Sequence, residues 1–169
     1  PVGRALHGFK GVPLSEEYRV TGLFYELEGY KFRKYLDIRR ITEGSSTPDL
    51  MVVMMNPGSS YPLNGNENDS RATEAAPDNT QQQIMKVMDG AYLNYARILN
   101  LSDLRTPESG VLYKFIKSEN QRKINHSIFS SERAGELKKL FVNGVPVIFA
   151  WGVHSALTSI ARTAVETLK

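Results

Sequence analysis

The sequence predicts an α/β fold: a three-layer α/β/α sandwich with a short, mostly parallel central sheet, preceded by a β-hairpin. Two continuous apolar runs, residues 50–55 and 145–151, each end in turn residues, as is typical of strands buried on both faces. Patterns of amphipathic helices lie between and after these runs, and that alternation indicates a sheet with helices on both faces. The length predicts a single domain over residues 1–169.

The hairpin is predicted from residues 20–27 and 31–41. Both segments are rich in β-branched and aromatic residues, and a turn containing Gly29 joins them. The second segment carries five Lys and Arg residues, which fit either a phosphate-binding surface or a solvated strand face. Residues 1–18 are polar and show no sustained period, so they predict an N-terminal arm.

A long polar loop is predicted over residues 58–79. It contains four asparagines and almost no large apolar residue. A connection of this length in a compact domain is usually a functional lid or a disordered segment. Because this one leaves directly from the candidate site described below, we favour a lid.

The rest of the chain predicts helices and one further core strand. We expect the strand over residues 91–101 and helices over residues 81–89, 106–117, 130–142 and from His154 onward. Asp78 or Thr80 can cap the first of these helices, and Thr106 followed by Pro107 is a typical helix start.

Composition limits the classes of function. The chain has no cysteine, a net charge of +3 and no apolar run long enough to span a bilayer, so we expect a cytoplasmic protein with no membrane partner. Its three histidines lack metal-ligand spacing, and neither of the common glycine-rich nucleotide-binding motifs is present. We therefore expect neither a metal nor a cofactor. The mild positive charge is compatible with a nucleic-acid or nucleotide partner.

Polar turns follow both apolar runs, at residues 56–60 and 151–154. If the two strands are parallel, both turns lie at the carboxyl edge of the sheet, where open α/β sheets bind ligands. Asn56 can orient a water molecule or bind an amide-bearing base, and the backbone N–H groups that follow it can hold an anion. Trp151 offers a stacking surface for a planar ligand, and His154 offers a titratable base.

Each of these residues also has a purely structural interpretation. The Asn-Pro-Gly sequence at Asn56 fits a turn that only ends a strand. Trp151 fits core packing, and His154 fits a helix-start residue bonded to the backbone. Asp78 fits a helix cap as well as a general base.

Four short motifs resemble landmarks of a bacterial and phage domain family of unknown function. They are Asn56-Pro57-Gly58-Ser59-Ser60, Asp78-Asn79-Thr80, Leu93-Asn94 with Leu101-Ser102-Asp103, and Ala150-Trp151-Gly152. The family has an Asn-Pro-Ser turn, an Asp-x-Thr, a Val-Asn-Leu-Phe strand and an Ala-Trp-Gly in the same order. The likeness spans the chain from the hairpin to the start of the last helix.

More distantly, Met55-Asn56-Pro57-Gly58 resembles the first motif of the mismatch-specific and single-strand-selective uracil-DNA glycosylases. That resemblance implies a uracil-DNA glycosylase-like fold and an N-glycosidic hydrolase acting on a nucleoside, or on a base in DNA or RNA. It makes Asn56 the residue that holds the attacking water, with Asp78 as the candidate base. The residues expected to bind substrate are Pro57, Gly58, Ser59, Ser60, Thr80, Asn94, Trp151, Gly152 and His154.

Two other classes of function stay open from the sequence. The same edge of the sheet fits a non-catalytic module that binds a nucleotide, a nucleic acid or a protein. The loop over residues 58–79 alternatively fits an interaction protein that uses this loop to contact its partner.

Overall fold

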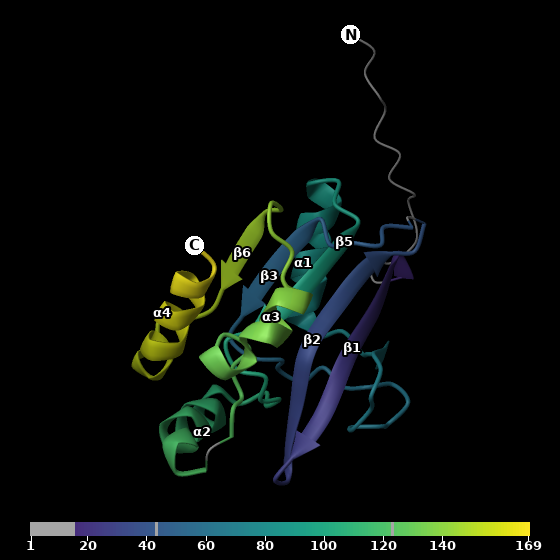
Figure 1. The fold of residues 1–169 in the computed structure, drawn as a ribbon. Coiled ribbons are helices and arrows are strands. Elements are labelled where there is room, and N and C mark those ends of the chain that lie inside the picture. Colours follow the sequence, from purple (N-terminus) through teal and green to yellow (C-terminus); the bar gives the residue numbers. More distant parts are fainter. Residues whose placement is uncertain (1–15, 43, 123) are drawn as a thin grey trace, which may run out of the picture.

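The computed structural model describes residues 16–42, 44–122 and 124–169, so the predicted arm lies outside the described residues except at its last three positions. One six-stranded sheet has the order β4-β1-β2-β5-β3-β6 (Figure 1). The strands are β1 (Tyr18–Leu27), β2 (Tyr30–Arg40), β3 (Leu50–Met54), β4 (Thr73–Glu74), β5 (Tyr95–Asn100) and β6 (Val147–Ala150). The helices are α1 (Asn79–Gly90), α2 (Ser109–Arg122), α3 (Ala134–Leu140) and α4 (Thr158–Thr167), with 3-10 turns η2 (Ser131–Arg133) and η3 (Ser155–Leu157).

The predicted α/β class is confirmed, but the sheet is mixed rather than mostly parallel. β3 is parallel to both β5 and β6, whereas β1 pairs antiparallel with β2 and β4, and β2 pairs antiparallel with β5. The predicted hairpin is present as β1 and β2. It does not precede the sheet, however, because β2 pairs with β5 through Leu36 and Ile98 and so extends the sheet.

Helices cover both faces of the parallel strands. α1 packs its Met85 against the face that carries Val52, while Leu137 of α3 and Ala164 of α4 pack on the opposite face with Val53. Figure 1 shows α1 behind β3 and β5 and α3 in front of the sheet. Since successive side chains of a strand point to opposite faces, all five residues of β3 are buried. None of the helices in the described residues is long and apolar enough to span a membrane.

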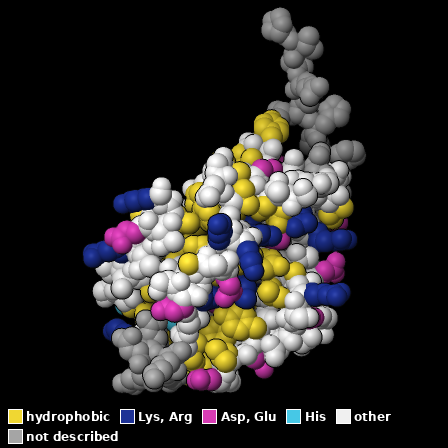
Figure 2. All heavy atoms as spheres, viewed as in Figure 1, with side chains coloured by type: hydrophobic (Ala, Val, Ile, Leu, Met, Phe, Trp, Pro, Cys, Tyr) yellow, Lys and Arg dark blue, Asp and Glu magenta, His cyan; other side chains and the backbone are white. Residues whose placement is uncertain are grey.

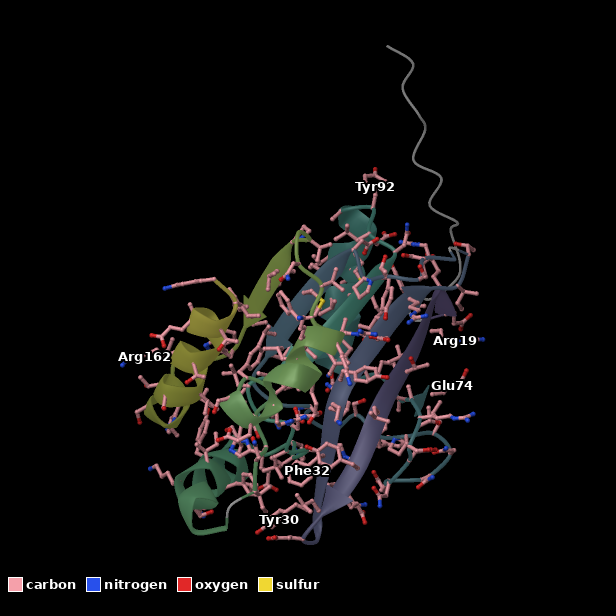
Figure 3. The ribbon with its side chains drawn as sticks, viewed as in Figure 1. Arg19, Tyr30, Phe32, Glu74, Tyr92 and Arg162 are labelled. Atoms are coloured by element: carbon pink, nitrogen blue, oxygen red, sulfur yellow. The ribbon has the colours of Figure 1, made fainter. Side chains whose placement is uncertain are left out.

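The predicted elements exist with shifted ends for local reasons. β5 begins at Tyr95 rather than residue 91, because Tyr92 has a positive φ of 56° and is 81% exposed (Figure 3). α2 begins at Ser109 rather than Thr106, whose hydroxyl instead accepts from the Glu108 N–H. The apolar face expected for the last helix is confirmed at Ala164, which is fully buried.

The segment predicted as a long polar loop is tied to the sheet at several points. Its residues Thr73 and Glu74 form β4 against β1, and Pro62 forms a bridge with Ala75. Glu67 accepts from both terminal nitrogens of Arg105 and from Lys31 Nζ at 3.1 Å. This segment is therefore not structureless, because it contains a short strand and contacts the edge of the sheet. Its role as a lid stays a prediction.

Replacing Glu67 tests this tether. The Arg105 hydrogen bonds hold the pKa of Glu67 below its ordinary value, so its ionised form stabilises the fold above about pH 4.5, and this contribution is lost as the pH falls through the lowered pKa. Glu67→Ala is expected to lower the free energy of unfolding by about 1–3 kcal/mol at neutral pH, and by less in acid. Urea denaturation at neutral pH and in acid measures the free energy of unfolding of the parent and of the variant.

Glu74→Ala is the matched control, because among the described residues the Glu74 side chain forms a single ion pair, with the exposed Arg19 at 3.5 Å. Its expected effect is below about 1 kcal/mol. Equal losses from the two variants would contradict the role given to Glu67.

Candidate functional site

Parallel pairing brings three strand ends to one edge of the sheet. Met54 at the end of β3 pairs with Asn100 of β5 on one side and with Ala150 of β6 on the other. The turn at residues 56–58 and the Trp151-Gly152 turn therefore leave from the same carboxyl edge. The prediction that the two apolar runs are parallel strands of one sheet is confirmed. The expectation that the second run is buried on both faces is wrong, because β6 is an edge strand whose residues are half-buried or exposed.

A cavity of about 490 Å³ lies at this edge, within the size range of small-molecule sites. It is lined by the end of β3, the start of α1, a segment after β5 and the end of β6, namely residues 54–58, Asp78, 80–81, 106–107 and 149–152. Of the residues predicted to form a site, those that line this cavity are Asn56, Pro57, Gly58, Asp78, Thr80, Trp151 and Gly152.

The Asn56 side chain is held in one orientation by two backbone carbonyl groups. Its Nδ2 donates to the carbonyl oxygen of Leu104 at 3.2 Å and to that of Thr106 at 2.7 Å. The reverse orientation of the amide would set oxygen against two oxygens, so the contacts identify the nitrogen. No donor among the described residues reaches Oδ1. Asn56 thus contributes a positioned, unused acceptor to the cavity wall.

Asp78 caps α1 with one oxygen and leaves the other beside the turn. Its Oδ1 accepts from the N–H groups of Thr80 at 2.9 Å and Gln81 at 3.1 Å, and the Gln81 side chain accepts from the Asp78 N–H. The predicted cap is confirmed. Oδ2 lies 2.9 Å from where a Cβ of residue 58 would stand, and Gly58 has a φ of +65°. Glycine is therefore required there for backbone conformation and for space.

Aromatic rings form the wall contributed by β6. The rings of Phe149 and Trp151 meet edge to face, with centroids 5.1 Å apart, and both residues line the cavity. Trp151 is also partly buried against the core cluster under α3 and α4. Trp151 therefore packs against the core and also lines the cavity, so both interpretations of this residue apply.

A β-bulge turns Arg33 of β2 toward this site. Leu23 pairs with Tyr35 and Phe24 pairs with Arg33, which leaves Lys34 as an extra residue in β2. Because paired residues share a face, Arg33 lies on the α1 face with Phe24. There its Nη1 donates to the Pro57 carbonyl oxygen at 3.4 Å.

Arg33 places a buried positive charge behind the cavity wall. It is fully buried, and this burial lowers its pKa to about 10, against the opposing effect of the nearby Asp78 and Asp103 carboxylates. The guanidinium therefore stays charged at neutral pH and compensates the negative charge of Asp78. Its Nε and Nη2 have no acceptor among the described residues.

Other buried polar groups lie at the same end of the sheet. Asn100 has neither amide atom hydrogen-bonded within the described part of the chain, and the same holds for Ser60 Oγ. Asp103 accepts from Arg133 at 2.7 Å and from the Tyr25 hydroxyl at 3.0 Å. Burial raises the pKa of Asp103 to about 6, although Arg133 acts in the opposite direction.

Four predicted site residues lie outside the cavity. Asn94 is at the opposite edge, where its N–H donates to Asp49 and its carbonyl accepts from the Arg40 N–H, so the expectation that it contacts a base is corrected. The asparagine at the carboxyl edge is Asn100. Ser59 is exposed and Ser60 is buried, and neither lines the cavity.

His154 is the fourth, and its contacts are structural. Its Nδ1 accepts from the Ala156 N–H at 3.2 Å, so it caps η3, and its ring stacks on Tyr113 with centroids 3.8 Å apart. The helix-start interpretation is therefore confirmed. No three His, Asp or Glu side chains of the described residues are grouped so as to hold a metal ion.

Sequence reasoning missed Arg33, Gln81, Phe149 and the 106–107 segment. Gln81 carried a usable signal, since Asp followed by Gln three residues later is a capping box. Thr106 and Pro107 resembled a helix start, and nothing in the pattern showed that the Thr106 carbonyl anchors Asn56. Arg33 could be placed only once the bulge was known.

Compared with protein-family models, with curated proteins and with solved structures, the chain shows no match.

Gly58→Ala tests the close approach of the turn to Asp78. A left-handed backbone at alanine costs about 1–2 kcal/mol, and the Cβ would also meet Asp78 Oδ2 at 2.9 Å. Gly144 is the matched control, because it has a φ of +82° and nothing within 4 Å of its Cβ position. We expect Gly58→Ala to lower the free energy of unfolding more than Gly144→Ala does in chemical denaturation. Equal losses would mean that Asp78 does not constrain the turn.

Proposed function

We propose that this protein is a glycosylase-like hydrolase that acts on a nucleoside or on a base in nucleic acid. The observation that carries the proposal is the Asn56 side chain, whose nitrogen is fully engaged while Oδ1 is left unused at a cavity wall. A carbonyl oxygen in this state can accept a hydrogen bond from a water molecule and so orient that water. The distant resemblance to uracil-DNA glycosylases at residues 55–58 supports the same role, as do the helices on both faces of the parallel strands.

The reaction requires few groups, and the cavity contains candidates for each. The water oxygen bonds to C1′ of the sugar, the C1′–N bond breaks, and the base leaves with the bonding electrons. Because the sugar becomes positively charged in the transition state, nearby negative charge lowers the barrier. Asp78 lines the cavity with a carboxylate whose Oδ2 has no donor among the described residues, so it can stabilise that charge and take the proton of the water.

The aromatic wall fits a planar leaving group. Phe149 and Trp151 offer ring surfaces, and base stacking on aromatic side chains contributes about 1–3 kcal/mol per base. A base within duplex DNA would first have to leave the helical stack, at a cost of about a few kcal/mol. A nucleoside or a single-stranded substrate avoids that cost.

A non-catalytic binding module is the second candidate. It is favoured by one observation, namely that both titratable candidates, Asp78 and His154, cap helices. Such a module would bind the same bases in the same cavity without releasing a product.

Asn56→Ala tests the proposal. The variant is expected to lose base release from any substrate that the parent cleaves, because the water is no longer oriented. Loss of the bonds to Leu104 and Thr106 should lower the free energy of unfolding by only about 1–2 kcal/mol, so the protein should remain folded. Base release is measured by chromatography on nucleosides and on uracil-containing single- and double-stranded DNA.

His154→Ala is the control for activity, since His154 lies outside the cavity. It should keep the parental rate. An Asn56→Ala variant with the full rate would contradict the catalytic role, and parental binding of a base without any product would favour the binding module.

A further inference from the structure

A second concavity, of about 740 Å³, lies on the sheet face that α3 covers only in part. It is formed by β1, β2, β5 and the loop after β2, and is lined among others by Thr21, Tyr35, Asp37, Arg39, Ser46 and Arg97. It lies at the start of β5, whereas the Asn56 cavity lies beyond its end. Figure 2, which views this face, shows Lys and Arg side chains gathered over α3 and β2.

Two arginines share one buried carboxylate at the base of this concavity. Asp37 Oδ1 accepts from Arg97 Nε at 2.7 Å, and Oδ2 accepts from Arg97 Nη2 at 2.9 Å and Arg39 Nη2 at 3.3 Å. The Tyr95 hydroxyl donates to the same Oδ2 at 2.7 Å. Asp37 carries one negative charge and the two arginines carry two positive charges, so one positive charge is uncompensated among these groups.

Two further arginines line the concavity, Arg40 and Arg19, and they differ in whether an acidic partner compensates their charge. Arg40 donates to Glu17 at 2.7 Å and to Asp89 at 2.9 Å, so its charge is compensated. Arg19 meets Glu74 at 3.5 Å, and both side chains are largely exposed. An exposed pair of this kind contributes about 0–1 kcal/mol, so Arg19 can turn toward an anion at little cost.

The arginine pair is also held rigid by aromatic rings. Arg39 Cζ lies 4.1 Å from the Tyr95 ring centroid, and Arg97 Cζ lies 5.0 Å from that of Tyr35. Arg97 has all its nitrogens engaged, since Nη1 donates to the Leu140 carbonyl at 3.3 Å. Arg39 is 44% exposed, and its Nη1 has no acceptor in the described part of the chain, whereas its Nε is buried without an acceptor. Arg97 thus supplies charge, and Arg39 supplies charge and free donors.

We propose that this concavity binds a phosphate group of a nucleotide or of a nucleic-acid strand. Arg39 donates to the phosphate from its planar fork, the geometry that suits phosphate oxygens. Thr21 of β1 and Ser46 of the loop after β2 also line the concavity and carry hydroxyl groups that can donate to a phosphate. The volume exceeds that of a phosphate alone and leaves room for the attached sugar and base.

The proposal is tested by titration with inorganic phosphate, uridine monophosphate and uridine, followed by NMR at the Arg39 Nε–H. Phosphate and uridine monophosphate should shift this signal, and uridine should not. The absence of any shift with phosphate, or an equal shift with uridine, would overturn the proposal.

Arg39→Gln should weaken uridine monophosphate binding at least about tenfold. Arg162→Gln is the matched control, because it removes the same charge from an exposed position on α4, at the opposite side of the molecule from Arg19 (Figure 3). It should change affinity less than about twofold, because distant surface charges are screened. An equal loss in both variants would mean that only the overall charge attracts phosphate, which contradicts a built site.

Two further variants keep the test independent of folding and of the proposed hydrolase. Arg39→Lys retains the charge but not the planar fork, so a folded variant should show an intermediate loss. Asn56→Ala should bind phosphate like the parent whether or not the chain is a hydrolase.

Fluorescence anisotropy with a short labelled oligonucleotide distinguishes the two sources of the phosphate group. Tighter binding than that of uridine monophosphate identifies a nucleic-acid strand, and weaker binding identifies a free nucleotide.

Discussion

The arrangement of this molecule depends on the parallel pairing of β3 with both of its neighbours. β3 is only five residues long and buried on both faces, and β5 and β6 run in its direction on either side. All three strands therefore deliver their carboxyl ends to one edge. If β6 ran the other way, Trp151 would lie at the far edge from Asn56 and no shared cavity could form. The direction of one short strand thus decides whether the polar turns meet.

The turn at residues 56–58 is constrained by three other parts of the chain. Backbone carbonyls after β5 hold the Asn56 amide, Arg33 of β2 donates to the Pro57 carbonyl, and the cap of α1 lies against Gly58. Each contact crosses between elements that are distant in the sequence. A polar group fixed in this way need not reorganise when charge develops nearby, which is the property that catalytic and binding sites require.

Local patterns predicted the parts of the fold that depend on local physics. The buried run of β3, the hairpin and the Asp78 cap follow from apolar continuity, β-branched content and capping chemistry, and all are present. The second apolar run forms a strand, β6, but at the edge of the sheet, where its residues are half-buried or exposed. The hairpin's place in the sheet could not be predicted, because its pairing with β5 is a long-range contact. The same limit applies to β4, a strand of two residues inside a polar segment.

The candidate site shows the same difference between features that depend on neighbouring residues in the sequence and features that depend on long-range contacts. Asn56 and Asp78 were predicted because they stand beside a strand end and a helix start. Asn94 was misplaced because the strand over residues 91–101 begins four residues late, after the positive φ at Tyr92. Arg33 escaped prediction because alternation along β2 assigns it to the opposite face, and one bulged residue reverses that assignment.

The central claim is that the carboxyl-edge cavity binds a nucleobase next to a fixed Asn56 oxygen. A crystal structure after soaking with uracil and uridine tests it most directly. We expect the base against Trp151, with a water molecule or the base itself within hydrogen-bonding distance of Asn56 Oδ1 and with Nδ2 still bonded to Leu104 and Thr106. A base bound only outside this cavity, or an Asn56 amide rotated so that Nδ2 faces the ligand, would contradict the account.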